Sequence, residues 1–295
     1  MKNTRLILLL FVLVNSAYSQ HTNQYSQYMF NGLVINPAFA GADDALDATI
    51  LCRNQWVGLE GAPKTASLSI HTPLVNKKLN VGISLISDNY GITHKNIFTG
   101  VFAYKIRFRE SSVSFGIQGG ADISRNNWDL VKTTEAGDNT FMGQKERSVI
   151  PVAGAGIYYR AKKYYAGFSS PSLLQFGKES RTVYKPFLLN AGYILKCSEN
   201  IVLKPSILAK YIRNAPLEMD LNLNAYYKNA GLGVSYRTND AFVFLLDYSV
   251  REQLRVGYAY DLTFSKLRTY NKGSHEIMLR YEFGYKVNTV SPRYF

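Results

Sequence analysis

The chain has 295 residues, of which 46% are hydrophobic and 14% aromatic, and its formal net charge is +13. Such basicity is typical of nucleic-acid-binding proteins, but here the Lys and Arg residues are dispersed singly and form no basic helix or run, so we expect no nucleic-acid partner. No stretch reaches about 18 uninterrupted apolar residues, which excludes a helical membrane protein.

The first 19 residues have the pattern of an export signal. Lys2 and Arg5 precede nine apolar residues at 6–14, and small residues at 17 and 19 suit signal peptidase. We expect the mature protein to begin at Gln20. Loss of the two basic residues leaves 32 Lys and Arg against 21 Asp and Glu, a net charge of +11.

Beyond the amino-terminal region, apolar and polar side chains alternate with a period of two. At 275–285, the residues His275, Ile277, Leu279, Tyr281, Phe283 and Tyr285 oppose Glu276, Met278, Arg280, Glu282 and Gly284. This pattern predicts fourteen strands, at 47–57, 64–72, 79–87, 97–108, 112–124, 149–160, 164–170, 183–196, 201–212, 217–227, 231–237, 242–248, 254–264 and 275–285.

An apolar face on nearly every strand requires a large apolar environment. Most of the strands have the nine to eleven residues that a tilted strand needs to cross a bilayer. The predicted fold class is therefore all-β, a transmembrane outer-membrane β-barrel of about 14 antiparallel strands. On the polar faces, the glycines are expected to relieve crowding at strand bends. They are Gly82, Gly116, Gly154, Gly156 and Gly233.

The domain plan has four parts. They are a signal peptide at 1–19, a segment at 20–46 that does not alternate and lies in the periplasm or the lumen, the barrel at 47–285 and a periplasmic tail at 286–295. Connections after even-numbered strands are short and several others are long, which places the long loops outside the cell. An even strand count then puts both termini in the periplasm.

Catalytic and redox chemistry find little support. His71 shares the inward face with Ser67 and Ser69, but residues two apart on one strand rarely form a nucleophile and base pair without a third orienting group. Cys52 and Cys197 are far apart in the sequence. Export permits a disulfide between them, but nothing in the sequence demands one.

Three aspartates, Asp43, Asp44 and Asp47, cluster where the first strand begins. They lack the regular alternation of calcium-loop ligands, so a structural role is the preferred interpretation. We expect that the protein is not an enzyme and that it binds no metal, cofactor or small-molecule substrate. Arg53 is expected to face inward, either paired with lumen carboxylates or lining a pore.

Two composite motifs follow the signal, YMFNGLVINPAFAG at 28–41 and RNQWVGLEGAPKT at 53–65. They resemble the opening signature of the PorP/SprF family of outer-membrane proteins of the type IX secretion system. EAGDNTF at 135–141 looks like the family's acidic Gly-Asp-Pro-x-Phe loop, with Asn139 in place of proline, and SPRYF at 291–295 is similar to its Pro-Arg-aromatic terminus. The motif residues taken as partner-binding candidates are Tyr28, Asn31, Asn36, Pro37, Ala38, Gly41, Arg53, Trp56, Gly58, Gly61, Pro63, Thr65, Asp138, Phe141, Pro292 and Arg293.

The resemblance implies a non-enzymatic barrel in secretion, gliding motility or surface retention of secreted cargo. Its partners would be other type IX components or a secreted surface adhesin, with outer-membrane lipid around it. Other readings remain open. A general diffusion porin whose inward Lys and Arg favour anions is one alternative, and an outer-membrane hydrolase is a remote one. Asn36, Pro37 and Gly41 are also explained by a simple bend into the first strand.

Overall fold

The computed structural model describes residues 23–74, 77–130, 145–175 and 185–284. Among these residues, no helix has the length and apolarity needed to cross a membrane. The strands are β1 (Leu46–Asn54), β2 (Lys64–Pro73), β3 (Leu79–Tyr90), β4 (Thr93–Arg107), β5 (Ser111–Asn127), β6 (Lys145–Ala161), β7 (Tyr164–Gln175), β8 (Phe187–Tyr193), β9 (Leu195–Lys196), β10 (Ile201–Tyr211), β11 (Glu218–Tyr227), β12 (Ala230–Arg237), β13 (Ala241–Ser249), β14 (Leu254–Thr263) and β15 (Ser274–Phe283).

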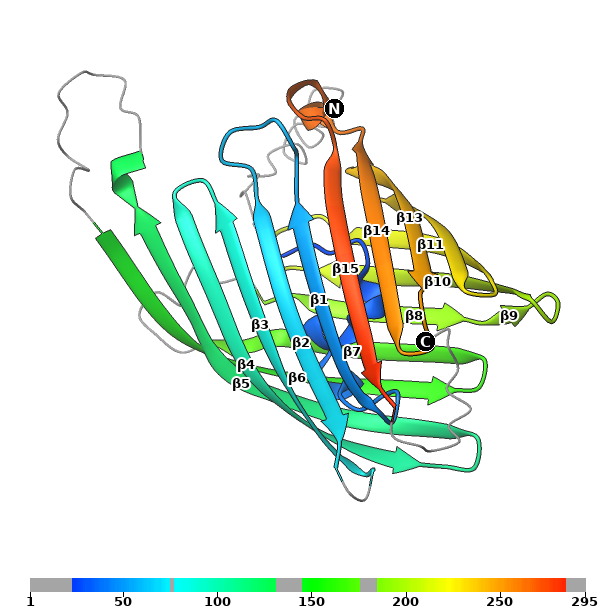
Figure 1. Cartoon of the computed structure of the whole chain (residues 1–295). Coiled ribbons are helices and arrows are strands. Elements are labelled where there is room, and N and C mark those ends of the chain that lie inside the picture. Colours follow the sequence, from blue (N-terminus) through cyan, green and yellow to red (C-terminus); the bar gives the residue numbers. More distant parts are fainter. Residues whose placement is uncertain (1–22, 75–76, 131–144, 176–184, 285–295) are drawn as a thin grey trace, which may run out of the picture.

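The strands form one closed antiparallel sheet (Figure 1). β1 pairs with both β2 and β15, and β11 pairs with both β10 and β12, so the sheet has no free edge. β8 and β9 both pair with β10 and are two parts of one strand interrupted at Ile194. The barrel therefore has fourteen strands, and the predicted fold class is confirmed.

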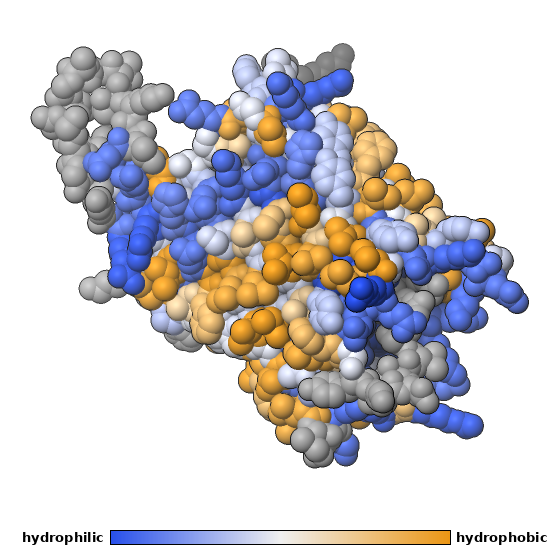
Figure 2. All heavy atoms as spheres, in the orientation of Figure 1, coloured by the Kyte–Doolittle hydropathy of each residue, from blue (hydrophilic) through white to orange (hydrophobic). Residues whose placement is uncertain are grey.

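The outer wall is apolar, as the alternation predicts for a barrel in lipid. On β15, Ile277 and Leu279 are 58% and 42% exposed, whereas Glu276 and Met278 are fully buried. Figure 2 shows hydrophobic side chains spread across the wall, with hydrophilic ones toward the ends of the strands.

Five strands extend at least three residues beyond their predicted ranges, namely β3, β4, β5, β6 and β7. β4 has 15 residues and β5 and β6 have 17 each. Their added ends are polar on both faces, as in the pairs His94↔Arg125 and Asn126↔Glu146. Backbone pairing does not need apolar side chains outside the hydrocarbon, so the hydrophobic pattern stops before the strand does.

The segment before β1 lies inside the barrel (Figure 1). Residues 23–45, which we call the plug, contain three single turns of 3₁₀ helix, η1 (Tyr28–Phe30), η2 (Gly32–Val34) and η3 (Pro37–Phe39). Tyr28, Leu33 and Ala38 are at most 2% exposed. Enclosure by the strands removes from water the apolar side chains that this segment cannot bury by itself.

The plug runs along the length of the lumen. Gln24 donates to Glu218 at the start of β11 (3.0 Å), and Asp44 accepts from Arg107 at the end of β4 (3.0 Å). We call the first end the long-loop end, with connections 55–63, 91–92, 128–144, 176–186, 212–217, 238–240 and 264–273. The other is the short-turn end, with connections 74–78, 108–110, 162–163, 197–200, 228–229 and 250–253.

The path of the plug separates the first described residue from the start of β1. The even strand count places the start of β1 and the end of β15 together at the short-turn end, where Leu46 pairs with Phe283. Residue 23, however, lies at the long-loop end, because the plug crosses the lumen before the first strand begins. The described chain therefore begins at the long-loop end and finishes at the short-turn end, and the two termini to which the prediction refers lie outside the described residues.

Candidate functional site

The plug is anchored near its start by a buried network of ionic hydrogen bonds. Arg53 Nη2 lies 2.7 Å from Asp261 Oδ2, and Arg53 Nη1 lies 3.2 Å from Glu276 Oε2. Ser26 donates its hydroxyl to Asp261 (2.8 Å). The backbone N–H groups of Ser26 and Gln27 donate to Glu276 at 2.8 and 2.7 Å. Two carboxylates of β14 and β15 thus bind both the plug and an arginine of β1, Asp261 through the Ser26 hydroxyl and Glu276 through the plug backbone.

A second arginine extends this network along the wall to β11 and β12. Arg237 on β12 pairs with Asp220 on β11 (3.0 Å) and with Asp261 on β14 (2.9 Å), and its other nitrogen donates to the Ser26 hydroxyl (3.3 Å). Arg237 is completely buried. Burial of so many charges is tolerated only because each is paired and hydrogen-bonded.

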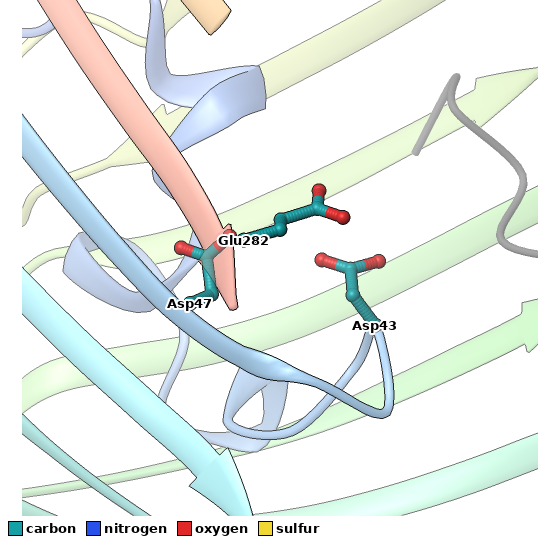
Figure 3. Close-up of side chains that lie close together, drawn as sticks. All are labelled: Asp43, Asp47 and Glu282. Atoms are coloured by element: carbon teal, nitrogen blue, oxygen red, sulfur yellow. The ribbon is translucent and has the colours of Figure 1, made fainter. Parts of the chain in front are cut away.

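The other end of the plug carries the acidic cluster. Asp43 of the plug, Asp47 of β1 and Glu282 of β15 offer oxygens that all lie within 4.8 Å of one another (Figure 3). Such oxygens suit a hard cation, but Arg280 already binds them, at 2.6 Å from Asp43, 2.6 Å from Asp47 and 3.0 Å from Glu282. Burial would raise the pKa of Asp43, yet Arg280 and Arg160 together hold that pKa well below its ordinary value.

Gly41 fixes the last bend of the plug. Its φ is +67°, and a side chain there would collide with Asn80. Its N–H donates to His71 Nδ1 at 3.3 Å, and its carbonyl accepts from Lys105. The imidazole that invited a nucleophile interpretation is therefore bound to the plug backbone.

Glycines on the wall make room for the Asn36-Pro37-Ala38 turn. Asn36 Oδ1 accepts from the N–H of Ala38 (2.9 Å), and Asn36 Nδ2 donates to the Ile157 carbonyl of β6 (3.0 Å). A Cβ on Gly116 would lie 2.2 Å from the nitrogen of Ala38, and one on Gly156 would lie 2.2 Å from Asn36 Oδ1. These two glycines were expected to relieve bends in the wall, but the space they leave is filled by the plug.

Gly116→Ala is therefore expected to destabilise the plugged barrel by about 1–3 kcal/mol, because backbone on both sides must move to admit one methyl group. Gly119→Ala, three residues along β5, is the matched control, since a Cβ there meets nothing within 4 Å. Urea unfolding followed by heat-modifiable gel migration measures both. Equal stability of the two variants would contradict the close seating of the plug.

Above the plug, the long-loop end of the lumen forms a cup of about 170 Å³. Its floor includes Tyr25, Tyr28 and Ile35 of the plug, and its wall carries the inward apolar residues Ile86, Ile97, Val152, Leu188 and Leu208. Its charged residues are paired, Lys95 with Asp122 (2.8 Å) and Lys210 with Glu218 (2.9 Å). This lining, partly apolar and partly of paired charges, differs from the polar interior of a water-filled barrel and could accommodate apolar groups of a ligand or partner.

Comparison with known proteins decides the family. The sequence matches the type IX secretion system membrane protein PorP/SprF family over residues 17–281. The chain belongs to this family. The expected resemblance is confirmed, and the closed barrel is the outer-membrane fold of a type IX secretion system membrane protein.

Solved structures support the barrel fold of this PorP/SprF member. It is similar to the CymD monoaromatic hydrocarbon channel, with 13% identity over 87% of this chain and 93% of that chain and a TM-score of 0.51. A Pseudomonas aeruginosa FadL homologue (10% identity, 84% and 93% coverage, TM-score 0.47) and the KdgM porin (10%, 81% and 99%, 0.42) also match. At these identities the likeness concerns fold alone. No curated protein matches the sequence.

The PorP/SprF motifs divide between the plug and the long-loop end. Tyr28 accepts from Asn222 (2.6 Å), and Asn31 is buried. In the second motif, Arg53 and Thr65 point into the barrel, where Thr65 donates to Asp88 (2.7 Å). The turn between them contains Trp56, Gly58 and Gly61, all with positive φ, and Pro63, whose carbonyl accepts from Gln55. The candidates Asp138, Phe141, Pro292 and Arg293 lie outside the described residues.

The partners of Arg53 and of the plug were not singled out from the sequence. They are Arg237, Asp261, Glu276 and Arg280, together with Asp220, which pairs with Arg237. A signal for them exists, since each is a charged residue at an inward position of a strand whose outward positions are apolar. Their pairing depends on which strands are neighbours, which the alternation does not specify.

Proposed function

We propose that this barrel is a non-enzymatic docking component of the type IX secretion machinery. It binds other secretion components, or retains a secreted surface protein, at its long-loop end. The plug is the observation that supports this proposal. Ser26 and Gln27 of the plug are hydrogen-bonded to Asp261 of β14 and Glu276 of β15. At the other end Asp43 is paired with Arg280 of β15, so the plug is held inside the lumen and forms part of the lining of the cup.

The alternative of an anion-favouring diffusion pore finds less support. That interpretation relied on free inward Lys and Arg, but Arg53, Arg237, Arg280 and Lys105 are engaged in ion pairs with acidic side chains. Their charge is neutralised within the wall and plug, so little is left to attract a passing anion.

Conductance and partner recovery test the docking proposal together. In planar bilayers the native barrel is expected to give no steady open-channel current. Deletion of residues 25–41, with the export signal kept, should give an inserted barrel that conducts ions and recovers less of the type IX components from detergent-solubilised membranes. A native barrel with a steady open pore would favour the porin. A deletion variant with unchanged conductance and recovery would exclude a role for the plug in either.

For orientation, we propose that the long loops face the cell exterior and the short turns the periplasm. Cys197 is a natural reporter, because it is an exposed free cysteine in the short connection 197–200. A membrane-impermeant maleimide should leave Cys197 unlabelled in intact cells and label it after permeabilisation. Glu60→Cys, in the connection 55–63, should be labelled in intact cells. Labelling of Cys197 without permeabilisation would reverse the assignment.

A further inference from the structure

The short-turn end carries a repeated pair of residues. At or beside each of its six connections, an exposed Lys or Arg is next in sequence to an exposed large apolar residue. The pairs are Lys78 with Leu79, Arg109 with Phe108, Lys163 with Tyr164, Lys196 with Leu195, Lys228 with Tyr227 and Arg251 with Val250. We call these six cations the short-turn rim. Because the connections are spaced around the whole barrel, the rim surrounds its perimeter.

Charge at this end is predominantly positive. Among the described residues, the exposed cations here are Lys78, Arg107, Arg109, Lys162, Lys163, Lys196, Lys228 and Arg251, and the exposed carboxylates are Glu110, Glu199 and Glu252. Glu110 pairs with Lys162 at 2.7 Å. The six rim cations therefore outnumber the acids that remain.

Their apolar neighbours fix the depth of the rim. Tyr227 and Phe108 are 56% and 58% exposed on the outer wall, where lipid is the only environment that favours them. A cation directly next to such a residue in the sequence then lies at the depth of the headgroups, with its aliphatic stem over the apolar wall. Lys228 lies over the ring of Tyr227, 5.4 Å from its centroid.

The long-loop end also has exposed cations, but they are placed differently. Lys64, Arg125, Arg147, Arg213, Lys266 and Lys272 are exposed, and none has an exposed large apolar residue directly beside it in the sequence. Arg125 and Arg147 pair with each other in the polar ends of β5 and β6, which extend past the apolar part of the wall. These six residues therefore lack the adjacent apolar side chain that each cation of the short-turn rim has.

We propose that the short-turn rim binds the phosphate groups of anionic phospholipids in the leaflet at this end of the barrel. The perimeter arrangement favours lipid over an acidic protein, because a protein partner would contact one sector, whereas headgroups surround the barrel on all sides. Each Lys or Arg near a membrane surface adds about 1 kcal/mol of attraction to anionic lipid, or about a fivefold preference. Six such positions define a preference strong enough to measure.

The test compares two variants with the same change in net charge. The rim variant replaces Lys78, Arg109, Lys163, Lys196, Lys228 and Arg251 with glutamine, and the matched control replaces Lys64, Arg125, Arg147, Arg213, Lys266 and Lys272. Full-length barrels are reconstituted in vesicles of equal phosphatidylglycerol and phosphatidylcholine and extracted in mild detergent. Mass spectrometry then gives the ratio of the two lipids that remain bound.

The native barrel and the control should retain phosphatidylglycerol in excess, and the rim variant should lose that excess by about tenfold or more. Sodium chloride at about 0.5 M should reduce the native excess, because salt screens exposed charges. Heat-modifiable migration checks folding. If the rim variant does not fold, the salt series and the double variant Lys163→Gln, Lys228→Gln test the proposal in its place. Both should then show a reduced excess of phosphatidylglycerol.

Retention of the excess by the rim variant, or an equal loss in the control, would overturn the proposal. The proposal would also be overturned if the native barrel retained no excess of phosphatidylglycerol and the rim variant instead lost type IX components. The rim would then bind an acidic protein. Bound lipid is measured independently of conductance and of partner recovery. Failure here therefore leaves the docking function untouched.

Discussion

Arg53→Leu is expected to lower the free energy of unfolding of the barrel by about 3–5 kcal/mol, the usual cost of removing one member of a buried ion pair. Asp261 would keep Arg237 and the Ser26 hydroxyl as partners. Glu276 would keep only the N–H groups of the plug, at 2.8 and 2.7 Å. An uncompensated charge would then remain at a completely buried position. Urea unfolding followed by heat-modifiable migration measures the loss.

Two further variants identify the cause of that loss. Lys162→Leu breaks an exposed pair with Glu110 of similar length, 2.7 Å, and should cost much less, because solvent screens this pair. Arg53→Leu combined with Glu276→Gln removes the unpaired charge and should recover part of the stability. If the double variant is no more stable than the single one, the charge of Glu276 is not the origin of the effect.

Leu279→Arg should destabilise the barrel by about 2–4 kcal/mol, because it places a cation on the lipid face near the middle of the hydrocarbon. Leu279 lies between Ile50 of β1 and Val256 of β14, all three on the outer wall. Refolding into vesicles with a urea titration measures the change.

The cost of an arginine on the lipid face depends on its depth in the bilayer. Phe283→Arg is the matched control, since Phe283 is the last residue of the same strand and lies on the same face. An arginine there is close to the headgroups and should cost about 1 kcal/mol or less. Equal losses at the two positions would contradict the placement of the bilayer around this wall.

Much of the wall was predictable because it follows from local alternation. The strand predicted at 254–264 is observed as Leu254–Thr263, and that predicted at 275–285 as Ser274–Phe283. A bilayer imposes one rule on every outward position, so period two is enough to identify both strands and faces. The rule fails for β4, β5 and β6 where they leave the hydrocarbon, because outward residues such as His94 and Arg125 are then free to be polar.

The site was less predictable because its contacts join distant parts of the chain. Ser26 meets Glu276, and Asp43 meets Arg280, only because closure of the barrel brings β15 beside β1. One local signal was present. Met278 is apolar at an inward position, and in the structure it is completely buried in the cluster that includes Tyr25 and Met29 of the plug. An apolar residue on the inner face indicates a surface covered by the plug.

The path of the plug also has a consequence for biogenesis. Residues 24–44 contact wall residues from β1 to β15, so their binding surface is complete only when the last strand has arrived. Once β15 pairs with β1, entry of the plug would require threading the amino terminus through a closed cylinder. The seam between these two strands should therefore form last, around an amino-terminal segment already in place. For this chain, the order of assembly follows from the topology: the first residues to leave the export channel are enclosed by a wall that closes after them.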